Sequence, residues 1–288
     1  MVNQLGFAKR FLLLVTPIAT SSALAPLALS IAASPSLAAT LASSEARFDI
    51  DKFSHNLLKT ETFTDTDTFT DATSRQATAE AEAFAEFIQL PPSASNSSFS
   101  TTNGDGSNYF GQAESLAAVI GYNFLVREGE TFSFDFKGSL NLKTSIDDSQ
   151  TESASAAGDL SLVLIDNTDQ VVLDFFTLSG ALTTPGDGDD DFLSPDKSAN
   201  ITLIPSGTSF DTSFGGKQEF VKSSVQGKFS RTFNSLTSLT LVEAKSNQAN
   251  VAAVPEPSTI LASLFFCLAG LGYKMRSKVF GAKPNISQ

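Results

Sequence analysis

Along much of the middle of the chain, polar residues alternate with residues that are apolar or small. Such a period of two is typical of β-strands. In the stretch 61–71, ETFTDTDTFTD, threonine occupies every second position. At 132–136, three phenylalanines alternate with polar residues, which predicts a strand with one buried and one solvated face. The same reasoning predicts strands at 201–204, 220–229 and 236–244.

The stretch 77–87 has two interpretations. Alanine alternates strictly with Thr, Glu and Phe, which favours a strand. Alanine and glutamate are also good helix formers, so a helix is the alternative. We favour the strand because the alternation is unbroken.

The segments 160–165 and 171–176 are apolar, and the polar residues 166–170 separate them. This arrangement predicts a β-hairpin. Eight to ten strands with no convincing long helix predict an all-β fold, an antiparallel and jelly-roll-like β-sandwich, over residues 39–245. Within it, the Ser-, Asn- and Gly-rich segment 91–108 is expected to be an exposed loop, and 246–253 a short flexible linker.

The N-terminal residues have the three-part organisation of a secretory signal peptide. Lys9 and Arg10 precede apolar stretches at 11–15 and 23–33, and small residues at 36 and 38 suit a cleavage site. We therefore expect a signal peptide at 1–38 that is cleaved after Ala38. An uncleaved anchor is the alternative, although three prolines argue against a long helix there.

The C-terminal residues combine a rigid polar motif, an apolar run and a basic cluster. The motif is Val254, Pro255, Glu256, Pro257, Ser258 and Thr259; the basic residues are Lys274, Arg276 and Lys278. The run 260–273 between them carries no charge, which predicts a single transmembrane helix with its positive end in the cytoplasm. As a helix it spans about 21 Å against a hydrocarbon core of about 30 Å, so a buried helix is the alternative.

This order of parts at 254–278 resembles the PEP-CTERM sorting signal of exported bacterial proteins. The resemblance implies recognition by an exosortase-type membrane protease, after handling by signal peptidase and the general secretion machinery. It also implies an inner-membrane anchored precursor and a mature form at the cell envelope, the surface or the extracellular matrix, with extracellular polysaccharide as a partner. The family usually ends abruptly, whereas here residues 279–288 follow as a short cytoplasmic tail.

Charge is concentrated in the middle of the chain. Of 31 acidic residues all but Glu256 lie between 40 and 253, which leaves 30; of 19 basic residues six lie outside, which leaves 13 and a net charge of 13 − 30 = −17. So acidic a region repels nucleic acid and anionic lipid, and we exclude both as partners.

The single cysteine, Cys267, excludes a disulfide framework within the chain.

Residues suited to catalysis are few. His55 is the only histidine, and no nucleophile elbow accompanies it. We therefore predict that the protein is not an enzyme, with a secreted hydrolase that uses His55 as a remote alternative. No cofactor is expected other than Ca²⁺.

Asp187, Asp189 and Asp191 sit at alternate positions of one loop, an arrangement that offers oxygen ligands to Ca²⁺. The EF-hand pattern fails, because Phe192 and Ser198 stand where it requires Gly and Glu. The ordinary interpretation is a solvated acidic loop. The predicted function is a non-enzymatic exported envelope or matrix protein; the alternative is a surface glycan- or Ca²⁺-binding β-sandwich module.

Overall fold

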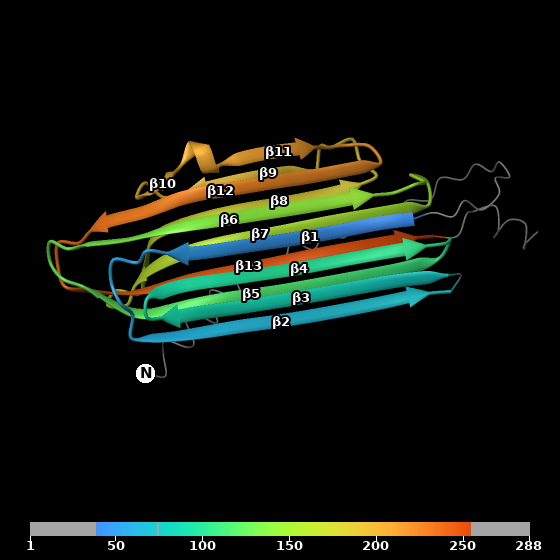
Figure 1. The fold of residues 1–288 in the computed structure, drawn as a ribbon. Coiled ribbons are helices and arrows are strands. Elements are labelled where there is room, and N and C mark those ends of the chain that lie inside the picture. The colour runs from blue at the N-terminus through green and yellow to red at the C-terminus, as the bar shows by residue number, and fades with distance from the viewer. Residues whose placement is uncertain (1–38, 74, 255–288) are drawn as a thin grey trace, which may run out of the picture.

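The protein consists of two β-sheets packed face to face (Figure 1). In the computed structural model, residues 39–73 and 75–254 are described. They form thirteen strands and one short 3-10 helix. The elements are β1 (Ala39–Asp51), β2 (Lys59–Ala72), β3 (Gln76–Gln89), β4 (Pro92–Asp105), β5 (Tyr109–Val126), β6 (Thr131–Ser145), β7 (Glu152–Asp166), β8 (Val171–Thr184), β9 (Phe192–Lys197), β10 (Ile201–Leu203), η1 (Pro205–Gly207), β11 (Ser209–Ser213), β12 (Gln218–Thr232) and β13 (Thr237–Ala253).

Sheet A has the strand order β10-β12-β6-β1-β4-β3, with β11 also paired to β12, and sheet B has the order β2-β5-β13-β7-β8-β9. Every strand pairing in both sheets is antiparallel. The prediction of an all-β, antiparallel protein is therefore confirmed, and the two facing sheets are consistent with a β-sandwich.

Phenylalanine fills one half of the space between the sheets, which we call the aromatic half. Phe136 is 1% exposed, and its ring lies 5.4 Å from that of Phe48 and 5.2 Å from that of Phe176. Phe132, Phe134 and Phe229 form a second contact group in the same core. Burial of these large apolar surfaces is the main stabilising term in such a core.

The other half of the interior is lined by small and polar side chains, and we call it the small-residue half. Along β1 the inward positions change from Thr40, Ala42 and Ser44 to Phe48 and Ile50, all of them buried. Strand β6, which pairs antiparallel with β1, shows the same change, with Thr144 opposite Ala42 and Phe136 opposite Ile50. Side-chain size therefore falls along the length of the sandwich.

The structure confirms the strands predicted from alternation. The Thr-rich stretch lies in β2, and the ambiguous stretch 77–87 is a strand, β3. The segments 160–165 and 171–176 lie in β7 and β8, which pair as the predicted hairpin. The strands expected at 132–136, 201–204, 220–229 and 236–244 correspond to β6, β10, β12 and β13, although β10 ends one residue earlier and β13 begins one residue later.

The interpretation of 91–108 as an exposed loop is wrong. Residues 92–105 form β4, which lies between β1 and β3 in sheet A. Asn96, Ser98, Ser100 and Thr102 point inward and are at most 1% exposed. Composition misled the prediction, because small polar residues suit a strand wherever the opposite sheet offers hydrogen-bond partners.

The expected linker at 246–253, and with it the domain boundary at 245, is also wrong. Strand β13 continues to Ala253 and lies between β5 and β7 over its whole length. Its polar residue Asn247 is 3% exposed and is hydrogen-bonded inside the sandwich. Strands β1 and β5 were not expected either, so the described residues hold more strands than the eight to ten predicted.

Among residues 39–73 and 75–254, no helix is long and apolar enough to cross a membrane. The predicted signal peptide at 1–38, the transmembrane helix at 260–273 and the tail at 279–288 all lie outside the described residues.

Replacing Phe136 with Ala removes a ring that contacts two others at the centre of the aromatic half. We expect the free energy of unfolding to fall by about 3–5 kcal/mol because a cavity remains. Phe84→Ala is the control: Phe84 is 51% exposed, so its loss should change stability by about 0.5 kcal/mol or less. Chemical denaturation of both variants measures the difference, and equal effects would contradict this description of the core.

Candidate functional site

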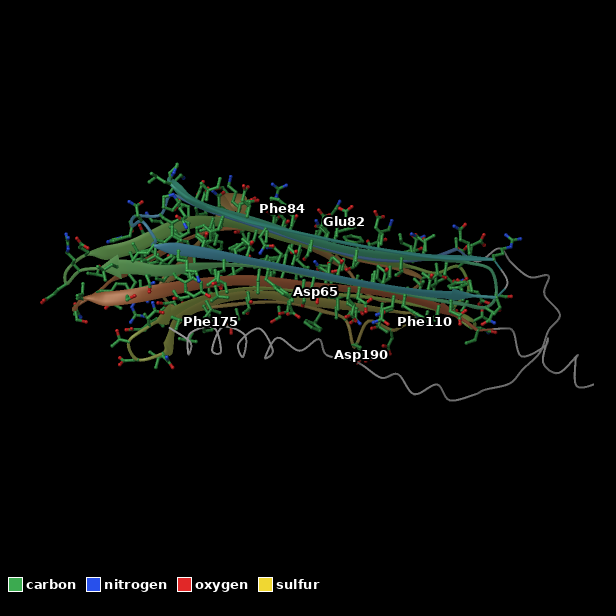
Figure 2. All side chains as sticks on the ribbon, turned by 90° about the horizontal axis from the view of Figure 1, so that it is seen from below. Asp65, Glu82, Phe84, Phe110, Phe175 and Asp190 are labelled. Atoms are coloured by element: carbon green, nitrogen blue, oxygen red, sulfur yellow. The ribbon has the colours of Figure 1, made fainter. Side chains whose placement is uncertain are left out.

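One long side of the sandwich is formed by the edge strands of both sheets. β2 ends sheet B and β3 ends sheet A, and the two strands lie against each other across the seam between the sheets. Figure 2 looks onto this side, with Glu82 and Phe84 of β3 toward the outside of one layer and Phe110 toward the outside of the other.

Small side chains face each other across this seam. The alternate threonines of β2 stand opposite inward residues of β5, as Thr64 does with Ala117. The alternate alanines of β3 stand opposite inward residues of β4, as Ala83 does with Ser98. Because neither row fills the space between the sheets, a groove of about 530 Å³ remains.

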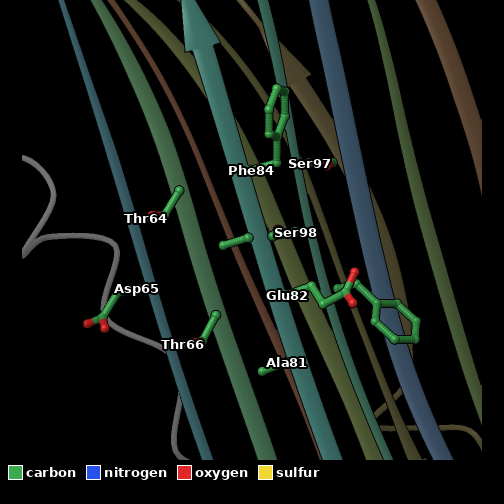
Figure 3. Close-up of a pocket in the computed structure, with 10 residues that line it drawn as sticks. Thr64, Asp65, Thr66, Ala81, Glu82, Phe84, Ser97 and Ser98 are labelled. Atoms are coloured by element: carbon green, nitrogen blue, oxygen red, sulfur yellow. The ribbon is translucent and has the colours of Figure 1, made fainter.

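The groove is lined by three strands. Its lining residues are Thr64, Asp65, Thr66, Ala81, Glu82, Ala83, Phe84, Ser97, Ser98 and Phe99. Figure 3 shows Thr64 and Thr66 on one side of β2 and Asp65 on the other. The bottom of the groove therefore consists of hydroxyl groups and small apolar surfaces, and the charged groups lie at its edges.

The outward faces of both edge strands are acidic. Between 59 and 89 there are seven acidic and two basic residues. The two basic residues are already paired: Lys59 donates to Glu61, and Arg75 lies 3.4 Å from Asp105. Exposed aromatic rings interrupt the acidic rows, with Phe69 56% and Phe84 51% exposed.

The predicted Ca²⁺ ligands lie on the opposite side of the molecule, in the loop between β8 and β9. Asp191 accepts hydrogen bonds from the backbone N–H groups of Thr183 at 2.8 Å and Gly215 at 3.4 Å. Asp187 accepts from the backbone N–H of Asp189 at 3.3 Å. Two of the three aspartates thus hold the loop in shape. Within residues 39–73 and 75–254, no group of three or more metal-ligating side chains is placed to hold an ion.

Glu219 of β12 is a buried carboxyl group that the sequence did not single out. It is 1% exposed and accepts hydrogen bonds from the hydroxyls of Thr184 and Thr144, while its Oε1 atom has no partner. Burial raises the pKa of Glu219 above its ordinary value, the Thr184 hydroxyl opposes this, and the Asp191 carboxylate raises the pKa further.

A second buried polar group lies at the centre of sheet B. The Lys245 ammonium donates to Glu243 at 2.8 Å, and the two side chains are 0% and 1% exposed. Burial raises the pKa of Glu243 and lowers that of Lys245, and each shift is opposed by the partner's charge. Asn96 of β4 also donates to Glu243, so this pair links the two sheets.

His55 lies between a serine and a carboxylate in the loop between β1 and β2. Its Nδ1 is 2.8 Å from the Ser54 hydroxyl, and its Nε2 is 3.2 Å from Glu130. The same hydroxyl accepts from the backbone N–H of Ser133 at 2.8 Å, which fastens the loop to β6. The hydrogen bond from the backbone N–H of Arg127 does most to hold the pKa of Glu130 below its ordinary value, and the hydrogen bond with His55 contributes next.

These three residue types are those of a hydrolase triad, but none of them lines the groove. Their hydrogen bonds have a structural use in holding the loop. The expectation that the protein is not an enzyme stays a prediction.

The sorting motif begins where the described residues end. Val254 is 45% exposed, and its backbone N–H donates to the carbonyl of Thr151 at 3.0 Å. The remaining motif residues at 255–259, the basic residues Lys274, Arg276 and Lys278, and the predicted cleavage residue Ala38 lie outside the described residues.

Comparison of the chain with protein-family models, with curated proteins and with solved structures gave no match.

The raised pKa of Glu219 predicts how stability depends on pH. An unfolded glutamate releases its proton near pH 4.5, while folded Glu219 retains it to higher pH. The folded state therefore binds more protons above pH 4.5, and stability falls as pH rises, by at most about 1.4 kcal/mol per pH unit. Glu219→Gln should remove this contribution, so its decline should be smaller than that of the wild type. Denaturation between pH 4 and 8 measures it, with Glu80→Gln, on exposed β3, as the control that should follow the wild type.

Proposed function

We propose that the protein is a non-enzymatic exported protein of the cell envelope or extracellular matrix, sorted through the PEP-CTERM-like signal at 254–278. The sandwich is the part of the protein that is displayed outside the membrane. Residues 1–38 direct export, and residues 260–273 form the membrane helix of the precursor. The partners are signal peptidase, the secretion machinery and an exosortase-type protease.

The observation that supports this proposal is the position of the two ends of the sandwich. The backbone N–H of Ala39 donates to the Asp147 carboxylate at 3.1 Å, and that of Val254 donates to the Thr151 carbonyl at 3.0 Å. Both ends thus meet the single turn 147–151 between β6 and β7. Removal of 1–38 and of residues after 254 leaves every described strand intact.

Cleavage after Ala38 also suits the local chemistry. The first strand begins at Ala39, the next residue. Cleavage converts its backbone N–H into an ammonium group beside the Asp147 carboxylate, and a charged hydrogen bond is stronger than a neutral one.

An anchor at this end orients the sandwich. Strand β13 has 17 residues and spans about 55 Å. The end that carries the turns 90–91, 127–130 and 167–170 then lies farthest from the membrane, where matrix polysaccharide is within reach. The chain crosses repeatedly between sheets, which supports the jelly-roll-like connectivity that we propose.

The test changes Pro255, Glu256 and Pro257 together to Ala in the bacterium that produces the protein. We expect the variant to stay in the inner-membrane fraction as an unprocessed precursor, because the extended motif that a protease grips as a strand is gone. Fractionation and immunoblotting measure this, with Ser246→Ala, which leaves the motif intact, as the control. Unchanged processing of the triple variant would rule out the sorting role.

A surface glycan- or Ca²⁺-binding module is the second candidate function. The hydroxyl-lined groove beside the exposed ring of Phe84 favours it, because carbohydrate sites combine hydrogen-bonding groups with an aromatic face. Calorimetric titration of the full-length protein with Ca²⁺ and with matrix glycan distinguishes the two candidate functions. Binding heat lost in Thr64→Val or in Asp187→Asn supports the module, and absence of heat with both ligands removes it.

A further inference from the structure

The edge strands β2 and β3 each offer a long, continuous and unpaired side. Each has 14 residues, about 47 Å of extended chain. Among residues 39–73 and 75–254, neither strand has a second neighbour in its sheet. Proteins usually protect such edges from self-association with short strands, charged side chains, prolines, bulges or a covering segment. Neither strand contains proline, and both pair with their single neighbour without a register shift.

Acidic side chains flank this open side. On β3 the outward residues are Glu80, Glu82 and Glu86, interrupted by Phe84. On β2 the outward residues include Asp65 and Asp67. Two copies of the protein that paired through these edges would place carboxylates opposite carboxylates, which is destabilising. The charge pattern therefore disfavours a second copy and favours a partner with positive charge.

The groove provides room for the inner face of an added strand. A strand placed beside β3 extends sheet A over β2, because β2 and β3 lie against each other across the seam. Its inward side chains then enter the groove at Thr64, Thr66 and Ala83. Its outward side chains lie beside Glu82 and Phe84, whose exposed ring suits a neighbouring cation.

We propose that the open edge of β3 binds an extended polypeptide segment that carries Lys or Arg at alternate positions. Main-chain hydrogen bonds to β3 supply affinity, and the alternating side chains supply specificity. The basic side chains face the glutamate row, and the small side chains between them occupy the groove. This binding surface goes beyond the sorting role and does not depend on it.

The probe is a fluorescent eleven-residue peptide in which Lys alternates with Thr and Val, titrated onto the full-length protein in nonionic detergent. Two peptides serve as controls: one with Glu in place of Lys, and one with the same lysines and two Thr-to-Pro changes. We expect the Glu peptide to bind at least about tenfold more weakly because of repulsion. The Pro peptide should lose a similar factor, because it cannot continue the strand pairing. Equal binding of the Lys and Pro peptides would overturn strand addition.

The matched variants reverse three charges each. E80K/E82K/E86K acts on the outward row of β3, whereas D190K/D196K/D211K makes the same change at exposed positions in or near β9 and β11, on the opposite side of the sandwich (Figure 1). We expect about a tenfold loss of peptide affinity in the first and about twofold or less in the second. Equal losses would show attraction to net charge alone and would overturn the site.

Hydrogen exchange on the unmutated protein gives a test that needs no variant. Bound peptide should slow the exchange of amides in 76–89 and leave those of β9 and β11 unchanged. Binding without protection of β3, or with protection centred on 187–191, would also overturn the proposal.

Discussion

The polar side chains enclosed between the two sheets must form hydrogen bonds or ion pairs with one another, and the rest of the structure depends on these interactions. Lys245 and Glu243 form a buried ion pair on β13, and Asn96 reaches Glu243 from the opposite sheet. Asn247 accepts from Ser44 of β1 at 2.6 Å. A buried charge without its partner is far more costly than the pair is stabilising. Each bond between the sheets therefore holds β13 in one register against β1 and β4.

The same interior explains why the sandwich has a groove. Where Phe48 and Phe136 fill the space, the sheets enclose a closed aromatic core. Where Ala, Ser and Thr replace them, the hydrogen bonds of the small-residue half bring the sheets together, as between Ser100 and Ser115 at 3.0 Å. At the margin, the threonines of β2 and the alanines of β3 are too small to fill the space, and the groove opens there. The groove, like the small-residue half, therefore reflects small side chains between the sheets.

Sequence reasoning succeeded where the alternating residues differ strongly in polarity. The strands β2 and β3 could be predicted because period two is visible in their residue types. The hairpin of β7 and β8 could be predicted because a polar turn separates two apolar runs. It failed at β4, where both faces are polar and only the opposite sheet shows which face is buried. It also failed at the end of β13, where Ala249, Val251 and Ala253 are buried but the polar residues between them favoured the linker interpretation. The groove could not be predicted for a related reason. Two of the three strands that line it were predicted, but only the strand order of the two sheets brings them together. Glu219 gave no local signal, because its partners Thr144 and Thr184 are distant in the chain.

We propose that residues 39–254 form one displayed sandwich and that the segments on both sides of it are processing signals. This is tested by the intact mass of the protein isolated from the envelope and from the growth medium of the cells that produce it. We expect a species that begins at Ala39 and ends at or after Val254, within the sorting signal. A mature species that retains residues 1–38, or one cut inside a described strand, would contradict it.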